Sequence, residues 1–318
     1  MNEEFQYSLV TTVFNDKEEI ISLIKEMEKQ TFKPVEFLIA DGGSKDGTQE
    51  RIKEYAKTSL LNIRVLENGR MNIAQGFNYA IKNANCEYVG IVACGNHYPD
   101  NFFECLMEDF KLMPDIESAY SAITGCGDTS FAKVYTDIIL GGEYLGKFPT
   151  NHGNLTCKKL YVDENYFYEK FQYAGEDSEF FLRIMNHGHK VYGDERIVID
   201  WEVPTSVKEY IKQQDGYIVS DMEMFDNRVF FEVYGGRLRY TFLLICMVVL
   251  LIIPITRMAG IVLFIYFLYK NATKLLQGGG EYVKLYNISQ IYPIYVIFKK
   301  KKFLKRKNKI EKILHNYV

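Results

Sequence analysis

The sequence of 318 residues lacks several features that would assign it at once to a class of protein. Its six cysteines form no Cys-x-x-Cys pair, which argues against a zinc site or a disulfide framework and favours a reducing compartment. They stand at Cys86, Cys94, Cys105, Cys126, Cys157 and Cys246. Residues 1–20 lack the basic and then apolar pattern of a secretory signal, so we expect the N-terminal domain to stay in the cytosol.

The body of the chain lacks a net positive charge. The net charge is −3, yet residues 299–318 alone carry nine basic residues against one acidic residue, or +8, which leaves −11 for the rest. A nucleic-acid-binding domain needs its basic charge on the folded surface, so we expect no nucleic-acid partner. Hydrophobic residues make up 47% and charged residues 25%, which excludes wholesale disorder.

The first hundred residues alternate between apolar runs of strand length and segments of helical periodicity. This rhythm indicates βαβ units, and therefore an α/β fold with a mostly parallel, Rossmann-like sheet. The predicted strands cover residues 7–13, 35–40, 63–66 and 88–93. The first predicted helix begins after Asn15 or Asp16, the second runs from the turn at 41–48 to Lys57, and the third covers residues 73–84. In such sheets ligands bind beyond the carboxyl ends of the strands, which here are followed by residues 11–15, 41–48, 67–70 and 93–99.

The second half of the chain is less regular. Residues 161–171 and 178–188 have helical patterns, and residues 190–199 are typical of a strand. We expect residues 1–115 and residues 116–236 to be the two halves of one domain. Residues 237–298 then form a membrane-associated helical segment, and residues 299–318 form a basic cytosolic tail.

The C-terminal part contains a long apolar segment with one interruption. Residues 240–253 and 258–269 are almost wholly apolar, and Pro254 to Arg257 separate them. Arg237 and Arg239 precede the segment and the lysine-rich run follows it, so the positive-inside rule puts both ends in the cytosol. The pattern favours a hydrophobic helical hairpin or a re-entrant loop at the cell membrane, with the N-terminal domain on the cytoplasmic side. The alternative is a pair of buried core helices.

Two stretches carry the clearest chemistry, residues 8–15 and residues 37–48. Asp41, at the end of a buried strand, can accept a hydrogen bond from a base or ribose, and the glycines after it let a ligand approach the backbone. Ser44 and Asp46 could cap the next helix, so a tight turn without a ligand is the alternative. Together the stretches resemble the nucleotide-binding half of family-2 glycosyltransferases of the GT-A fold. The resemblance implies a donor site formed by Thr11, Thr12, Val13, Asn15, Asp41, Gly42, Gly43 and Ser44.

The resemblance extends over residues 5–205, and it implies that residues 1–115 bind the nucleotide-sugar donor and residues 116–236 bind the acceptor. Arg70, with the segment 76–84 that contains Asn78, is similar to the family segment that approaches the donor's diphosphate; a solvated loop arginine is the alternative. Glu176 and Asp177 match the family's Glu-Asp motif, which implies Asp177 as general base, oriented by Glu176. The alternative is that both acids only stabilise a helix N-terminus. Residues 92–102, 201–204 and 213–217 resemble the subgroup that builds exopolysaccharides such as succinoglycan.

One position departs from the family. The acidic metal motif should follow the fourth strand, but Ala93 and Gly95 stand there, and neither can bind a hard cation such as Mg²⁺ or Mn²⁺. Asn96 and His97 are the nearby substitutes. Either cationic side chains stabilise the diphosphate leaving group, or the domain binds without turnover. His152 is a further candidate for the acceptor site, although a lone loop histidine is usually solvated.

The resemblance implies an inverting glycosyltransferase of the hexosyltransferase type. It would move a sugar from a nucleoside-diphosphate sugar, a UDP-sugar in the first instance, to a lipid-linked or growing oligosaccharide. Other proteins of cell-surface polysaccharide synthesis are its expected partners, besides the membrane. A catalytically silent, glycosyltransferase-like membrane subunit that binds a partner or glycan is the alternative. The missing metal carboxylates and the apolar hairpin disfavour a soluble nucleotidyltransferase.

Overall fold

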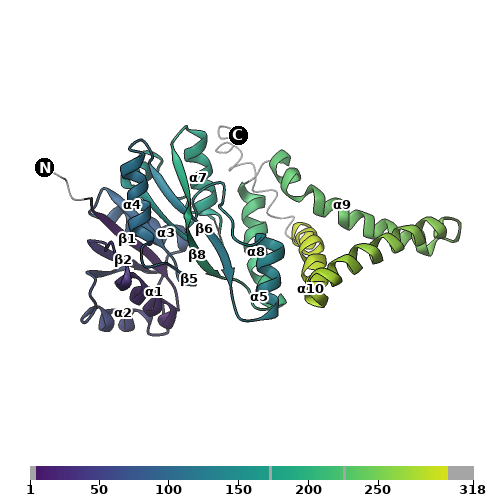
Figure 1. The fold of residues 1–318 in the computed structure, drawn as a ribbon, viewed down its shortest axis with the longest axis horizontal. Helices are drawn as coiled ribbons and strands as arrows, with labels where there is room; N and C mark the ends of the chain where they lie inside the picture. The colour runs from purple at the N-terminus through teal and green to yellow at the C-terminus, as the bar shows by residue number, and fades with distance from the viewer. Residues whose placement is uncertain (1–4, 172–173, 225–226, 300–318) are drawn as a thin grey trace. The chain divides into compact units, whose positions relative to one another are not determined.

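The computed structural model describes residues 5–171, 174–224 and 227–299 (Figure 1). Within these residues the chain forms two compact units. The first unit comprises residues up to 124 and residues 143–202, and the second comprises residues 125–142 and those from 203 onward. The boundaries that the sequence suggests near residues 116 and 237 stay predictions.

The first unit contains one mixed sheet of eight strands in the order β3-β2-β1-β4-β7-β6-β8-β5. Strands β1, β2, β3 and β4 are mutually parallel, whereas β7 is antiparallel to β4 and β6 is antiparallel to β7. The strands are β1 (Tyr7–Val13), β2 (Glu36–Asp41), β3 (Ile63–Glu67), β4 (Tyr88–Val92), β5 (Asn96–His97), β6 (Ser118–Cys126), β7 (Gly153–Cys157) and β8 (Val191–Glu202). The predicted α/β class is confirmed, and its parallel strands lie in the first part of the chain.

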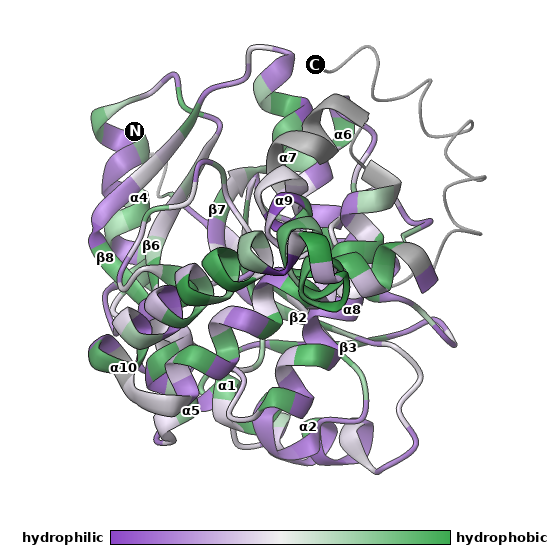
Figure 2. Ribbon diagram, turned by 90° about the vertical axis from the view of Figure 1, so that its right-hand side faces the viewer, coloured by the Kyte–Doolittle hydropathy of each residue, from purple (hydrophilic) through white to green (hydrophobic). Residues whose placement is uncertain are grey.

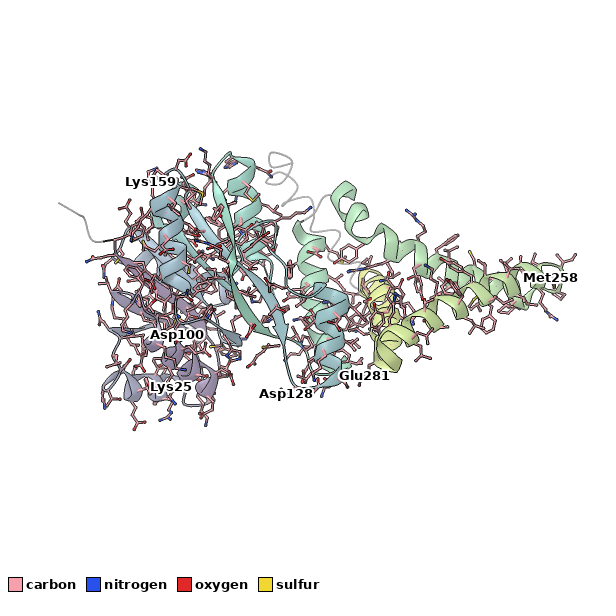
Figure 3. All side chains as sticks on the ribbon, in the orientation of Figure 1. Lys25, Asp100, Asp128, Lys159, Met258 and Glu281 are labelled. Atoms are coloured by element: carbon pink, nitrogen blue, oxygen red, sulfur yellow. The ribbon has the colours of Figure 1, made fainter. Side chains whose placement is uncertain are left out.

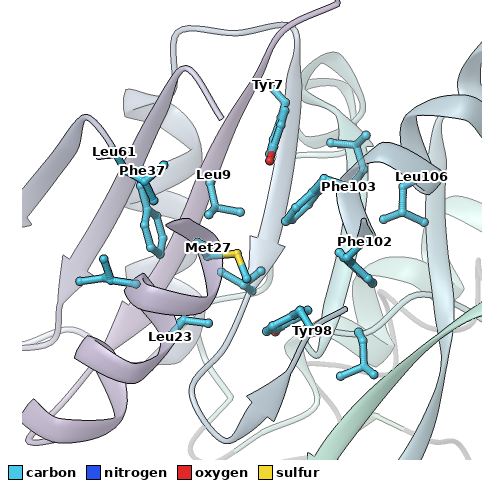
Figure 4. Packing of buried hydrophobic residues seen from close by; sticks show 14 of the residues in the cluster. Tyr7, Leu9, Leu23, Met27, Phe37, Leu61, Tyr98, Phe102, Phe103 and Leu106 are labelled. Atoms are coloured by element: carbon cyan, nitrogen blue, oxygen red, sulfur yellow. The ribbon is translucent and has the colours of Figure 1, made fainter. Parts of the chain in front are cut away.

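Helices cover both faces of this sheet, and the alternation of side chains along β1 explains why. Leu9 belongs to an apolar cluster with α1, α2 and α4, whereas Val10 belongs to a second cluster with α3, α6 and α7. Because both faces of a parallel sheet are buried, its strands read as continuous apolar runs. Figure 4 shows part of the first cluster, where Tyr7 stacks on Phe103 with ring centroids 4.7 Å apart. The helices are α1 (Lys17–Lys29), α2 (Thr48–Ala56), α3 (Ile73–Asn83), α4 (Phe102–Leu112), α6 (Lys158–Asp163) and α7 (Glu176–Asn186).

The helix predicted over residues 161–171 is wrong for most of its length. Helix α6 ends at Asp163, and Asn165 and Tyr166 then take left-handed φ angles of 57° and 62°. That conformation ends a helix, and it is uncommon for residues other than glycine. The chain then turns so that Phe167 is buried among Phe77, Tyr161 and Phe180. Aromatic side chains at helical spacing predict a continuous helix. In the structure they belong in part to a loop, and Phe167 of this loop packs in the core.

The second unit is helical. Its elements are α5 (Ser130–Tyr135), the π-helix η1 (Thr136–Leu140), α8 (Val207–Met224), α9 (Asn227–Ile252), the 3₁₀ turn η2 (Pro254–Thr256) and α10 (Arg257–Lys299). A small core joins α8, α9 and α10 through Ile218, Met222, Tyr234 and Val296. Gly279, inside α10, takes φ +73°, which glycine adopts without strain. Helix α10 is bent, as Figure 1 shows.

Helices α9 and α10 form the predicted apolar hairpin, with η2 as its turn. Two stretches, Tyr234–Ile252 and Pro254–Gln277, are long and apolar enough to cross a membrane, and only 0% and 11% of them are buried. Figure 2 colours both stretches largely as hydrophobic, and Figure 3 shows Met258 at the turn of the hairpin with side chains projecting outward. This exposure contradicts the alternative of a pair of buried core helices. The basic run at 300–312 lies outside the described residues.

Candidate functional site

The carboxyl ends of β1 and β2 meet at one edge of the sheet. Val13 is paired with Asp41 in the parallel register, and the amide of Gly42 donates a 2.8 Å hydrogen bond to the Val13 carbonyl. The loops after the two strands are also joined, because Asn15 accepts a 2.8 Å hydrogen bond from the Lys45 amide through Oδ1. The two predicted donor-site stretches therefore form one continuous surface.

The side chain of Asp41 holds the turn that forms part of this surface. Its side chain is fully buried, and Oδ2 accepts hydrogen bonds from the amides of Gly43 and Ser44 at 3.1 and 3.0 Å. The Ser44 hydroxyl and the Gln49 side chain donate to the same carboxylate. Asp41 thus fixes the shape of the turn, whereas the predicted contact of Asp41 with a nucleoside stays a prediction.

A cavity of about 280 Å³ opens beside these loops. It is lined by Thr12, Val13, Phe14, Gly42, Met71, Asn72, Ile73, Ala74, Phe171 and Glu176. Glycines let the segments beside the cavity approach each other closely. A Cβ on Gly42 would lie 3.0 Å from the Met71 carbonyl oxygen. A Cβ on Gly76 would lie 2.1 Å from Oγ1 of Thr12, so α3 can approach β1 this closely only with glycine there. The cavity joins Thr12, Val13 and Gly42, which the sequence assigns to the donor, to Glu176 of the predicted acidic pair.

Six residues that line the cavity were not among the site residues predicted from the sequence: Phe14, Met71, Asn72, Ile73, Ala74 and Phe171. Phe14 directly follows β1 and is 50% exposed, and the Arg70 guanidinium carbon lies 5.9 Å from its ring centroid. Arg70 itself is exposed. Asn72 caps α3 by accepting a 2.8 Å hydrogen bond from the Gln75 amide. The sequence signal for Phe14 is an aromatic residue directly after an apolar run of strand length.

Asn78 and Thr11 are not among the residues that line the cavity. Asn78 is buried, and its side chain bonds to the backbone of Phe167 in both directions, at 2.8 and 3.0 Å, and to Glu169 at 2.9 Å. It thereby holds the loop after α6. Thr11 is also buried, and its hydroxyl has no partner within the described part of the chain.

The acidic pair begins α7. Gly175, with φ +97°, precedes the helix, and Glu176 is buried at the edge of the cavity. Asn151 contacts both acids: its side-chain amide donates to Glu176 Oε1 at 2.9 Å, and its backbone amide donates to Asp177 Oδ2 at 3.1 Å. Burial, and then the charge of Asp177, raises the pKa of Glu176 to about 8. Glu176 is therefore protonated at neutral pH.

The residues at the family's metal position do not fit a hard cation. Asn96 is buried, and its amide nitrogen donates to the Ala93 carbonyl at 3.0 Å while Oδ1 lies 2.7 Å from Nδ1 of His152. His97 is held by ion pairs to Glu26 and Glu202 at 2.8 and 3.1 Å. Within the described residues no group of three or more His, Cys, Asp or Glu side chains could hold a metal ion. No disulfide links the six cysteines.

Known proteins agree with this architecture. The sequence model of Glycosyl transferase family 2 matches residues 8–157. A dolichyl N-acetyl-alpha-D-glucosaminyl phosphate 3-beta-D-2,3-diacetamido-2,3-dideoxy-beta-D-glucuronosyltransferase of Methanococcus voltae is 28% identical over 231 residues, or 66% of this chain and 71% of that protein. The uncharacterized glycosyltransferase EpsJ of Bacillus subtilis is 26% identical over 120 residues, or 38% of this chain and 33% of EpsJ.

Solved structures with the same fold include two other transferases. A mannosyltransferase of Pyrobaculum calidifontis, solved with GDP-Man and Mn²⁺, has a TM-score of 0.61 at 14% identity and is matched over 94% of this chain and 87% of its own. TarS of S. aureus (residues 1–349), solved with UDP-GlcNAc, has a TM-score of 0.51 at 15% identity, over 69% of this chain and 66% of its own.

The mixed sheet of this chain, covered by helices on both faces, has the GT-A fold of these solved structures. The match of residues 8–157 to the family model and the similarity to curated glycosyltransferases support a family-2 glycosyltransferase.

Proposed function

We propose that the protein transfers a sugar from a nucleoside-diphosphate sugar, most simply a UDP-sugar, to a lipid-linked glycan, with inversion at the anomeric carbon. The observation that carries the proposal is the cavity that brings Thr12, Gly42 and Glu176 together at the edge of the sheet. A pocket at the carboxyl ends of parallel strands is where α/β proteins bind nucleotides. The relatives add support: TarS was solved with UDP-GlcNAc, and the archaeal relative is named for a dolichyl-linked acceptor.

In this scheme the donor's base stacks on the exposed face of Phe14, beside Arg70. The diphosphate lies towards Arg70 and the first turn of α3, which lines the cavity through Asn72, Ile73 and Ala74. Helix N-termini attract phosphate through their unpaired amides and the helix dipole. Because the residues at the family's metal position do not fit a divalent cation, no step of the scheme uses one.

The transfer step is a single displacement. A hydroxyl oxygen of the acceptor attacks the anomeric carbon from the face opposite the diphosphate. The bond from that carbon to the phosphate oxygen breaks, and its electron pair leaves with the nucleoside diphosphate. Asp177 takes the hydroxyl proton, while neutral Glu176 can donate a hydrogen bond to a sugar oxygen at the cavity edge.

The hairpin supports a membrane setting for this reaction. Tyr234–Ile252 and Pro254–Gln277 would each cross the roughly 30 Å apolar core of a bilayer. Two crossings return the chain to the side of the catalytic unit, which we propose is the cytosol. The lysine-rich run would then face the anionic inner leaflet, where each basic residue contributes about 1 kcal/mol.

A screen of donors tests the proposal. Full-length protein in detergent is incubated with UDP- and GDP-sugars and a polyprenyl-phosphate-linked sugar, with and without Mn²⁺ or chelator, and both hydrolysis and transfer are measured. We expect turnover of at least one UDP-sugar by the wild type and its loss in Asp177→Asn. Nucleotide binding without any turnover would favour the silent subunit instead, to which the missing metal carboxylates point.

A further inference from the structure

The start of β7 lies beside the end of β4. Val92 is paired with Gly153 in the antiparallel register, so the residues just before β7 face the segment that carries the family's metal motif. Asn151 and His152 occupy this position, next to the acids of α7. They belong neither to the donor cavity nor to its loops.

The hydrogen bonds of Asn96 fix the tautomer of His152. The Asn96 amide nitrogen donates to the carbonyls of Ala93 and Cys94 at 3.0 and 3.4 Å, so its oxygen is the atom that faces the imidazole. An amide oxygen only accepts, and therefore Nδ1 of His152 carries the hydrogen. Burial lowers the pKa of His152, against the opposing charge of Asp177, which keeps the ring neutral at pH 7. Nε2 then has a free lone pair and, within the described residues, no hydrogen-bond partner.

Trp201 lies on the other side of this imidazole. It is paired with Asn96 between β8 and β5, and directly opposed residues of antiparallel strands share one face of the sheet. The rings of His152 and Trp201 lie 4.8 Å apart between centroids, at 55° to each other, and both side chains are half-buried. Trp201 is the only tryptophan in the sequence.

Asn151 connects this pair to the acids. Its amide nitrogens hold Glu176 and Asp177, while its side-chain oxygen is buried and has no partner in the described part of the chain. Asn151 thereby places the acids of α7 beside the residue that precedes β7, His152. The acceptor atom that a ligand hydroxyl can use here is Nε2 of His152.

We propose that His152 and Trp201 form the subsite for the acceptor sugar, a pyranose that presents free hydroxyl groups. The apolar face of the pyranose packs on the Trp201 ring, and one hydroxyl donates to Nε2 of His152. A neighbouring hydroxyl then lies at Asp177, which takes its proton as the oxygen attacks the donor. This assignment rests on the proposed function and adds to it the residues that select the acceptor.

The single tryptophan makes the subsite directly observable. Full-length protein, saturated with UDP, is titrated with the methyl glycosides of glucose, galactose, mannose and N-acetylglucosamine, and the fluorescence of Trp201 is recorded. We expect a saturable change with at least one glycoside and none with mannitol, which has hydroxyls but no ring. His152→Phe keeps an aromatic ring but removes the acceptor atom, so it should weaken that glycoside about tenfold, the size of one hydrogen bond. His187→Phe, at the other end of α7, is the matched control and should change nothing.

Each outcome decides between the subsite and the donor site. Calorimetry with UDP verifies that His152→Phe is folded and tests the proposed function separately. If UDP binds but no glycoside changes the fluorescence of the wild type, the subsite is wrong and the donor site stands. Equal glycoside affinity in His152→Phe and wild type overturns the role of His152. If UDP does not bind to the wild type, the proposed function fails, whatever the glycosides do.

Discussion

Glu176 provides a quantitative test, because its burial couples the stability of the first unit to pH. Its pKa is about 8 in the folded protein, against an ordinary value of 4.5. Below pH 4.5 Glu176 is protonated in both the folded and the unfolded state, so it adds no pH dependence to the free energy of unfolding. Between pH 4.5 and 8 the unfolded chain loses a proton that the folded protein keeps. The free energy of unfolding should therefore fall by about 1.4 kcal/mol per pH unit over this window.

The substitution Glu176→Gln isolates this effect. Glutamine has the shape and the hydrogen-bonding groups of the protonated acid but cannot ionise. At pH 4.5 the variant should be as stable as the wild type, and at pH 7 it should be more stable, by up to about 3 kcal/mol. Glu179→Gln is unsuitable as a control because it would break the ion pair with Arg183. Glu54 is exposed, so Glu54→Gln is the better control, and its stability relative to the wild type should not change with pH.

Urea unfolding of full-length protein in detergent, followed by Trp201 fluorescence, measures this difference. Trp201 lies in β8, so its signal reports on the first unit. A constant difference between Glu176→Gln and wild type from pH 4.5 to 8 would refute the raised pKa. In that event Glu176 would be ionised at neutral pH and would compete with Asp177 for the role of base.

Three further outcomes follow from the site and the hairpin. Asp177→Asn should lose at least about 10²-fold in sugar transfer while it keeps UDP affinity, because it removes only the proton acceptor; an active variant would move the base elsewhere. Chelator should change the rate of transfer little, since Ala93 and Gly95 replace the acidic motif; a reversible loss of all activity would reveal ligands from outside this segment. Deletion of residues 237–318 should release the catalytic unit from membranes with nucleotide binding intact. Full-length protein that stays soluble without detergent would contradict the membrane role of the hairpin.

The sequence was most informative where local pattern decides structure. Strands β1, β2 and β4 are buried on both faces and read as continuous apolar runs, so their positions were predicted to within a residue. The turn from Asp41 to Thr48 was also predictable, because an acid followed by two glycines suits a tight strand-to-helix connection. Pro254 predicted the break between α9 and α10 in the same way.

The rest depended on contacts between distant residues. Asn78 was assigned to the donor by its place in a family motif, yet its amide meets Phe167, 89 residues later in the sequence. Asn151 contacts Glu176 and Asp177, which lie 25 and 26 residues later in the sequence, and no local sequence pattern indicates these contacts. The pKa of Glu176 likewise depends on burial, which is a property of the fold as a whole.

Calorimetric titration of UDP tests most directly the central claim, that the cavity beside β1 and β2 is the donor site. The wild type should bind UDP, and Phe14→Ala should bind it about tenfold more weakly, because a base stacked on an aromatic ring contributes about 1–3 kcal/mol. Phe14 is half-exposed, so its loss leaves the core intact. The control Leu60→Ala, at an exposed residue that does not line the cavity, should bind as the wild type does. A wild type that binds neither UDP nor GDP, or a Phe14→Ala variant with unchanged affinity, would contradict the account.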